Sequence, residues 1–239
     1  MLEQEEGNFI SKNSSEAGKG YTEEEKIGPN SFSIIRIIGK GSFGEVYLVR
    51  KISNKKLYAM KVLHKNQIMA QNLVKYALTE RNVLTVTSHP FIVKLLYAFQ
   101  TSEHMFLILK YAPGGDLGEY LQREKKFTEE RAKLYLAEVI LAIQHLHERG
   151  IIFRDLKPDN IVIDEEGHAL LTDFGLSKEG INGNEAAQSF CGSVAYLAPE
   201  ILSRTGHGKS VDWYLFGVLM YELLVGTPPY FSKNRYFDK

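Results

Sequence analysis

The stretch that most constrains this chain is residues 152–160, IFRDLKPDN, where a carboxylate, an ammonium and an amide stand close together. Pro158 argues against a continuous helix, so we expect a loop here, followed by a short strand over 161–163. A second acid, Asp173, follows another apolar run and begins the tripeptide Asp-Phe-Gly. Two carboxylates and an amide at these spacings can accept a hydroxyl proton at Asp155 and hold a divalent metal ion against phosphates at Asn160 and Asp173.

A glycine-rich segment, GKGSFGEV over 39–46, stands near the start of the chain. Glycines let backbone amides approach phosphate oxygens closely, where a Cβ atom would clash. The Gly-x-Gly-x-x-Gly pattern alone is weak, because it also occurs in dinucleotide-binding loops. A dinucleotide loop opens a helix, whereas residues 45–49 have the composition of a strand. The sequence therefore predicts a hairpin that covers phosphates.

Composition narrows the class of protein. The 239 residues suffice for one large domain or two small lobes, and 29 basic residues balance 29 acidic ones, which gives no support for bulk attraction to nucleic acid or membrane. The single cysteine, Cys191, excludes an intrachain disulfide and fits a reducing compartment; we expect a cytoplasmic location, with access to the nucleus left open. No apolar run reaches a membrane-spanning length of about 18 residues. Residues 1–30 are expected to form a disordered arm.

Three helices are predicted. Residues 73–87 have helical spacing of their apolar residues, and Thr128 is a good N-cap for a helix that ends near Gly150. Residues 210–224 form an apolar helix that contains Asp212. A buried carboxylate is expensive without hydrogen bonds, so Asp212 is expected to have partners.

Taken together, these segments resemble the catalytic core of protein kinases, with Phe153-Arg154-Asp155 in place of the family's His-Arg-Asp. The segment from Ser189 to Glu200 and the pair Gly206-His207 resemble the AGC group, and within it the ribosomal-subunit and serum/glucocorticoid kinases. The resemblance implies an α+β, bilobal fold. A small antiparallel β lobe with one key helix would span 31–110, and a larger, mainly helical lobe would span 111–239.

The resemblance also implies the cofactors ATP and Mg²⁺ and a set of site residues. Asp155 would accept the substrate's proton, Lys157 would neutralise the transferring phosphoryl group, and Asn160 and Asp173 would bind Mg²⁺. Lys61, held by Glu80, would orient the phosphates. The other implied nucleotide contacts are Gly39, Lys40, Gly41, Ser42, Phe43, Gly44, Val46, Ala59, Leu109, Lys110, Ala112, Asp116 and Val162.

Regulation and substrate choice are implied in the same way. Ser189 stands at the position phosphorylated by an upstream activating kinase, with Arg154 and Lys178 as the cations for its phosphate. Asp116, Asp159 and Glu222 match positions that favour Arg or Lys before the target residue of a protein substrate. The motif at 155–157 favours serine or threonine over tyrosine.

The chain also departs from the family. The helices that follow Pro229 in the family are absent, so we expect an incomplete lobe, an unpaired Glu200 and an exposed apolar surface along 213–224. Two alternatives stay open: a nucleotide-binding module without turnover that acts as a decoy or interaction module, and a kinase for small molecules. Binding of nucleotide without phosphoryl transfer would identify the first.

Overall fold

The computed structural model describes residues 27–41, 44–181, 187 and 194–230. Its contacts divide the chain into two compact units, one made of residues up to 77 together with 94–111, and the other of 78–93 together with residues from 112 onward. The first unit is built on a five-stranded sheet and the second is mainly helical. This arrangement confirms the predicted α+β class.

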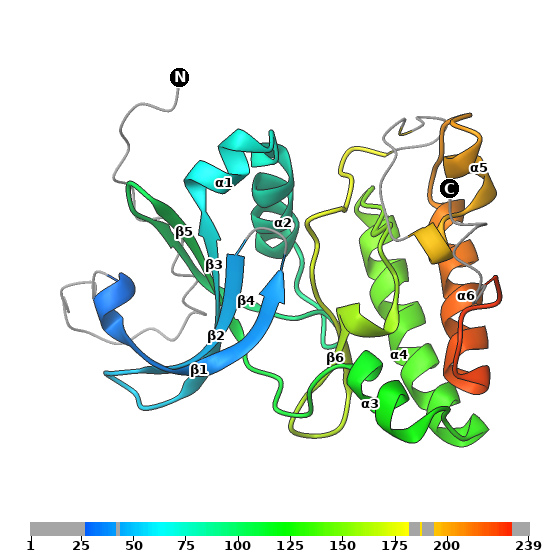
Figure 1. Cartoon of the computed structure of the whole chain (residues 1–239), viewed down its shortest axis with the longest axis horizontal. Helices are drawn as coiled ribbons and strands as arrows, with labels where there is room; N and C mark the ends of the chain where they lie inside the picture. The colour runs from blue at the N-terminus through cyan, green and yellow to red at the C-terminus, as the bar shows by residue number, and fades with distance from the viewer. Residues whose placement is uncertain (1–26, 42–43, 182–186, 188–193, 231–239) are drawn as a thin grey trace. The chain divides into compact units, whose positions relative to one another are not determined.

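The first unit is an antiparallel sheet with the strand order β1-β2-β3-β5-β4 (Figure 1). Its strands are β1 (Phe32–Gly41), β2 (Gly44–Lys51), β3 (Leu57–His64), β4 (Leu95–Gln100) and β5 (His104–Lys110). The short helix α1 (Lys65–Ala70) follows β3, and α2 (Val74–Val86) begins in this unit. The strand β3 is mostly buried because it lies between β2 and β5 and presents side chains to both faces.

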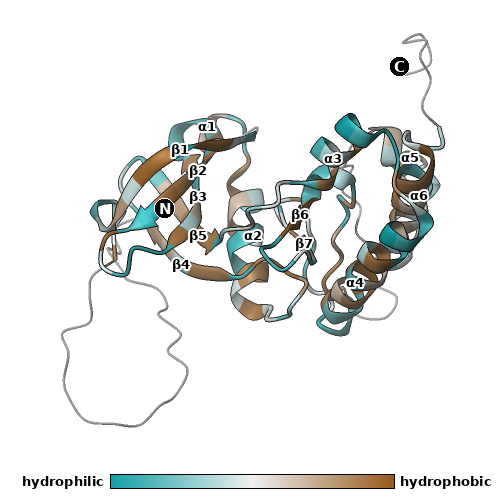
Figure 2. Cartoon of the chain, turned by 90° about the horizontal axis from the view of Figure 1, so that it is seen from below, coloured by the Kyte–Doolittle hydropathy of each residue, from teal (hydrophilic) through white to brown (hydrophobic). Residues whose placement is uncertain are grey.

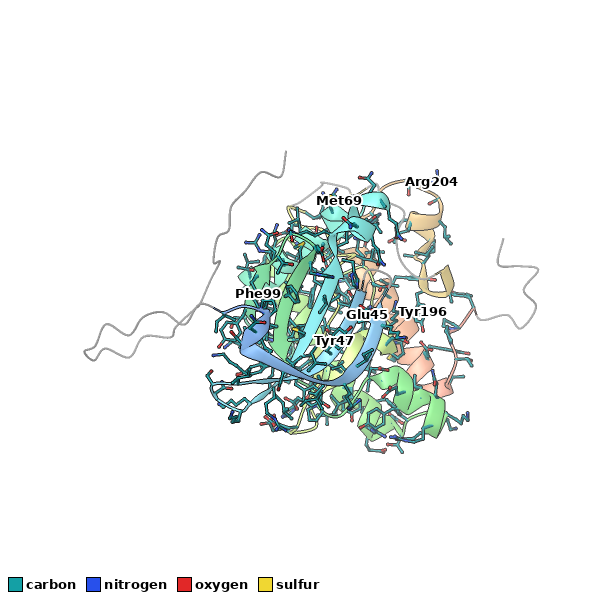
Figure 3. All side chains as sticks on the ribbon, turned by 60° about the vertical axis from the view of Figure 1, so that its left-hand side comes forward. Glu45, Tyr47, Met69, Phe99, Tyr196 and Arg204 are labelled. Atoms are coloured by element: carbon teal, nitrogen blue, oxygen red, sulfur yellow. The ribbon has the colours of Figure 1, made fainter. Side chains whose placement is uncertain are left out.

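An aromatic core covers one face of this sheet. Its buried members are Phe32, Val49, Tyr58, Met60, Val62, Phe106 and Ile108. Phe99 stacks on Phe106 with ring centroids 4.9 Å apart, and Figure 3 labels Phe99 and Tyr47, two of the partly buried side chains that pack against this core. Because side chains alternate along a strand, the residues between Tyr58, Met60 and Val62 belong to the opposite face of the sheet.

The second unit contains α3 (Leu117–Glu124), α4 (Glu129–Glu148), β6 (Ile161–Ile163), β7 (Ala169–Leu171), α5 (Pro199–Leu202) and α6 (Ser210–Val225). The predicted N-cap is confirmed, since the Thr128 hydroxyl accepts a hydrogen bond from the amide of Arg131 at 3.4 Å. After α4 the chain turns at Gly150, whose φ of 68° favours glycine. In Figure 2 the hydrophobic colour runs along both α4 and α6, which pack against each other.

The helix α6 carries apolar residues on all sides, and its two acidic residues, Asp212 and Glu222, are buried. One side is buried, and includes Val211, Leu215 and Leu219. On the remaining surface Trp213 is 41% exposed and Val225 is 51% exposed, and Met220, Tyr221 and Leu224 are exposed as well. The expected exposed apolar surface along 213–224 is therefore confirmed for these described residues. None of the helices in the described part of the chain is long and apolar enough to span a membrane.

Two boundaries differ from those predicted. Residues 78–93 fall in the predicted first domain but cluster with the second unit. At the end of this segment Val93 donates to the carbonyl of Leu171 and Leu171 donates to that of Phe91, each at 2.9 Å. At the amino end, the expected arm lies outside the described residues as far as residue 26. Pro29–Ser31 forms a turn of 3-10 helix and Ile27 packs against the aromatic core, so ordered structure begins before residue 31.

Candidate active site

The strand register gathers the predicted base and phosphate contacts of the first unit on one face of the sheet. Val46 on β2 lies opposite Lys61 on β3, and Ala59 lies opposite Leu109 on β5. Ala59 and Lys61 are two residues apart on one strand, so all four side chains share the face that the aromatic core leaves uncovered. The amide of Lys110 donates to the carbonyl of Lys94 at 2.9 Å, so a bond from Lys110 to a base would have to use its carbonyl oxygen.

The glycine-rich hairpin is formed as predicted, with Gly39 opposite Val46 and Gly41 opposite Gly44. Gly44 has a φ of 152°, and a Cβ atom on it would fall on the carbonyl oxygen of Val62. At Gly39 a Cβ atom would meet nothing closer than 3.6 Å. Position 44 therefore requires glycine for close backbone approach. Ser42 and Phe43 lie outside the described residues.

In the second unit, a buried carboxylate anchors the loop that carries Asp155. Asp212 on α6 is fully buried and accepts hydrogen bonds from the amides of Phe153 at 2.9 Å and Arg154 at 2.8 Å. His147 Nε2 lies 2.7 Å from the same carboxylate. These bonds hold Arg154 at a φ of 69°, a conformation that costs a residue other than glycine some strain. The expectation that Asp212 needs hydrogen-bond partners is confirmed.

Asp155 is only 7% exposed, and one of its oxygens binds two cationic or polar groups. Oδ2 accepts from Asn160 Nδ2 at 2.8 Å and from Lys157 Nζ at 3.0 Å, and Asn160 Nδ2 also bonds the Asp155 carbonyl at 2.7 Å. The carboxylate is thus held in one orientation. This arrangement can position a carboxylate to accept a proton from a hydroxyl group.

The β6–β7 hairpin brings the two predicted metal ligands to the same end. Ile161 lies opposite Leu171, so Asn160 precedes one strand and Asp173 follows the other, and the amide of Thr172 donates to the carbonyl of Asn160 at 3.0 Å. Asp173 is exposed, with a φ of 61°. Because Asn160 uses its nitrogen toward Asp155, its oxygen is the atom left for a metal. An amide oxygen and a carboxylate suit Mg²⁺, which completes its shell with phosphates and water.

Arg154 is buried and contacts the start of the predicted activation segment. Its guanidinium donates from Nε to the carbonyl of Leu176 at 2.7 Å and from Nη2 to that of Ser177 at 3.2 Å. Lys178 follows directly, and its backbone pairs with Ile152 through two hydrogen bonds of 2.9 Å. The two residues predicted to bind a phosphate on Ser189 therefore stand at adjoining backbone positions, while Ser189 lies outside the described residues.

The three acids predicted to bind basic substrates come together in the second unit. Asp116 caps α3 by accepting from the amide of Glu119 at 2.8 Å, and a Cβ atom on Gly118 would lie 3.0 Å from Asp116 Oδ1 and 3.2 Å from Asp159 Oδ1. Burial raises the pKa of Asp116, and the charge of Asp159 raises it further. Both effects also raise the pKa of Glu222, burial more strongly. Asp159 thus lies close enough to both Asp116 and Glu222 for its charge to act on each of them.

Glu222 is not a surface acid. It is 9% exposed, and its Oε2 accepts from the hydroxyl of Tyr196, labelled in Figure 3, at 2.5 Å. Sequence reasoning missed Tyr196, because no local pattern connects it with a partner on α6. It used His207 only as part of a family motif and did not predict that its imidazole lies against Arg154.

Residues 32–238 match the family described as protein kinase domain. This chain belongs to that family. It is 54% identical over 214 residues to human "Ribosomal protein S6 kinase alpha-3", covering 88% of this chain and 29% of that protein. It is 48% identical over 218 residues to the "RAC family serine/threonine-protein kinase homolog" of Dictyostelium discoideum, covering 91% of this chain and 49% of that protein.

These similarities confirm the predicted resemblance to AGC-group kinases. The chain spans less than a third of the ribosomal S6 kinase and about half of the Dictyostelium kinase. Lys61 belongs to the first unit, and Glu80, which is buried on α2, belongs to the second. The pairing of Lys61 with Glu80 stays a prediction.

Proposed function

We propose that this protein kinase domain binds Mg-ATP and transfers the γ-phosphoryl group to serine or threonine in protein substrates. The observation that carries the proposal is the Asp155 carboxylate, held by Lys157 and Asn160 on a loop that the buried Asp212 anchors. A fixed carboxylate beside an ammonium serves a hydroxyl nucleophile and an anionic transferring group at once. Positioning and electrostatics supply most of the rate in reactions of this kind.

Each residue of the loop has a distinct task in this mechanism. Asp155 accepts the proton of the attacking hydroxyl through the oxygen that does not bind Lys157 and Asn160. The Lys157 ammonium lies 3.0 Å from the Asp155 carboxylate and would neutralise charge on the phosphoryl group as it moves. Asn160 and Asp173 would hold Mg²⁺, which neutralises the phosphates of the nucleotide.

Further nucleotide contacts are proposed within each unit by itself. Val46, Ala59 and Leu109 offer an apolar face for the base beside Lys61, the expected partner of the α- and β-phosphates. In the second unit Asp116 and Val162 are bridged to each other, and Ala112 precedes them. The proposal includes Glu80 as the partner of Lys61, a cytoplasmic location, and activation by phosphorylation of Ser189 by an upstream kinase, with Arg154 and Lys178 as the phosphate-binding cations.

The acid group supports a preference for substrates with Arg or Lys before the target residue. Asp159 is exposed, and its charge reaches both Asp116 and Glu222. A guanidinium placed among these carboxylates would relieve their mutual repulsion. Asp116→Lys should weaken the preference for Arg-containing peptides. Because Asp116 also caps α3, Asp116→Asn serves as the control that keeps an N-cap oxygen. An unchanged peptide preference in Asp116→Lys would contradict this assignment.

The deciding experiment is transfer of labelled γ-phosphate from Mg-ATP to an Arg-rich serine peptide. Transfer by the 239-residue chain that is lost in Asp155→Asn and kept in Glu165→Gln, an exposed acid, would support the proposal. A folded chain that binds ATP but transfers nothing would instead support the nucleotide-binding module without turnover. Binding of Mg-ATP is measured on the same preparations, so that loss of folding and loss of chemistry are separated.

A further inference from the structure

His207 lies in the connection between α5 and α6 and is 4% exposed. Its backbone forms an isolated antiparallel bridge with Ala187, in which each amide donates to the other residue's carbonyl, at 3.0 and 2.9 Å. Ala187 belongs to the predicted activation segment. Two backbone hydrogen bonds therefore join His207 to Ala187 of that segment.

The His207 side chain meets the guanidinium of Arg154. Arg154 Nη1 lies 3.4 Å from His207 Nε2. A guanidinium offers only donors, so this contact is a hydrogen bond only when Nε2 is an unprotonated acceptor. Arg154 Nε and Nη2 already donate to the carbonyls of Leu176 and Ser177. The neutral imidazole thus supplies an acceptor for Arg154 in addition to these two carbonyls.

Among the described residues, charges that act on His207 come from the catalytic loop, α5 and α6. Burial lowers the pKa of His207 most, and the Arg154 guanidinium on the catalytic loop lowers it further. Glu200 on α5 and Asp212 on α6 act in the opposite direction, but Asp212 is occupied by the amides of Phe153 and Arg154 and by His147. The surroundings favour the uncharged imidazole near neutral pH.

We propose that neutral His207 is a positioning residue that helps to orient the Arg154 guanidinium, and that proton uptake by His207 breaks this contact. Protonation would replace an acceptor by a donor and set two cations against each other in a buried place. Arg154 immediately precedes Asp155, so loss of this contact changes the surroundings of the loop that carries the proposed proton acceptor. Phosphoryl transfer would then fall in weakly acidic solution; this consequence, but not the Arg154–His207 coupling, rests on the proposed function.

Two variants separate a positioning role from a merely structural one. His207→Gln can place an amide oxygen near the position of Nε2 and does not titrate in this range, whereas His207→Leu keeps bulk but offers no acceptor. We expect the activity of the wild type relative to His207→Gln to fall with decreasing pH, by up to about tenfold per pH unit below the His207 midpoint. His207→Leu should be impaired throughout the range. The ratio removes effects of pH on ATP and peptide, which are common to all variants.

A titration followed by NMR tests the coupling without activity. The wild-type chain is titrated from pH 8 to pH 5.5 while the His207 ring and the Arg154 Nε–H signals are recorded. Matching midpoints, with no such Arg154 transition in His207→Gln, would support the proposal. An Arg154 signal that ignores the protonation of His207, or a wild type and His207→Gln with the same pH profile, would overturn it. A chain that shows the coupled titration but transfers no phosphate would refute the proposed function and leave the coupling intact.

Discussion

Replacement of Asp212 by asparagine tests the anchoring of the catalytic loop. The carboxylate accepts from two amides at 2.9 and 2.8 Å and lies 2.7 Å from His147 Nε2, and it is fully buried. A hydrogen bond to a charged group contributes about 1.5–3 kcal/mol, and an unsatisfied buried donor costs about 1–3 kcal/mol. Asparagine keeps one acceptor oxygen and turns a second donor toward its neighbours. Since such terms do not add fully, we expect a loss of about 3–5 kcal/mol in the free energy of unfolding.

Trp213, the chain's single tryptophan, provides the assay. It follows Asp212 directly, and its ring meets His147 edge-on with centroids 5.4 Å apart, so urea unfolding followed by its fluorescence reports on this region. Glu165→Gln, at an exposed acid, should stay within about 0.5 kcal/mol of the wild type. Should Asp212→Asn be too unstable to purify, His147→Gln perturbs one of the three partners and should lose about 1–2 kcal/mol. A loss below about 1 kcal/mol in Asp212→Asn would refute the anchoring role.

Two further predictions concern the hairpins of the two units. Gly44→Ala should destabilise the chain by more than about 2 kcal/mol, because the added methyl group meets the Val62 carbonyl at a φ of 152°. The control Gly39→Ala should cost about 1 kcal/mol or less. Thermal unfolding compares the two variants, and equal shifts in the unfolding midpoint would contradict the close approach at Gly44. His168 bonds Glu138 at 2.6 Å, and this bond, followed by the charge of Glu138, raises the pKa of the imidazole. Its contribution to stability is complete below the unfolded pKa of about 6.5 and is lost as the pH rises through the higher folded value. An NMR titration of His168 in Glu138→Gln should show a lower midpoint than in the wild type, and an unchanged midpoint would count against the pairing.

Local chemistry made several elements predictable. Thr128 predicted the start of α4, Pro158 predicted the interruption before β6, and the strand composition after the glycine-rich segment predicted a hairpin rather than a helix. Each of these rules acts within a few residues, through a cap, a missing amide or a restricted φ angle. The short helices α1 and α3 were not predicted, because they carry too few periodic apolar residues to stand out.

Most residues of the candidate site were identified by their resemblance to a family, and for some the structure adds the contact that explains the identity. Asp155, Lys157 and Asn160 were predicted as separate contributors to chemistry, and they prove to share hydrogen bonds on one carboxylate oxygen. The predicted substrate acid Glu222 proves to be a buried partner of Tyr196. Ser42, Phe43 and Ser189 remain predictions outside the described residues.

The sequence by itself determined the three longest helices, the glycine-rich hairpin, the loop at 152–160 and the residue types available for phosphoryl transfer, because these follow from neighbours along the chain. Only the tertiary structure decided that Asp212 binds the amides of residues 153 and 154, that Tyr196 donates a hydrogen bond to Glu222, and that His207 contacts Arg154. It also decided that residues 78–93 join the second unit. These pairings link residues far apart in the chain, and packing of whole elements around buried polar groups, rather than any local preference, selects them.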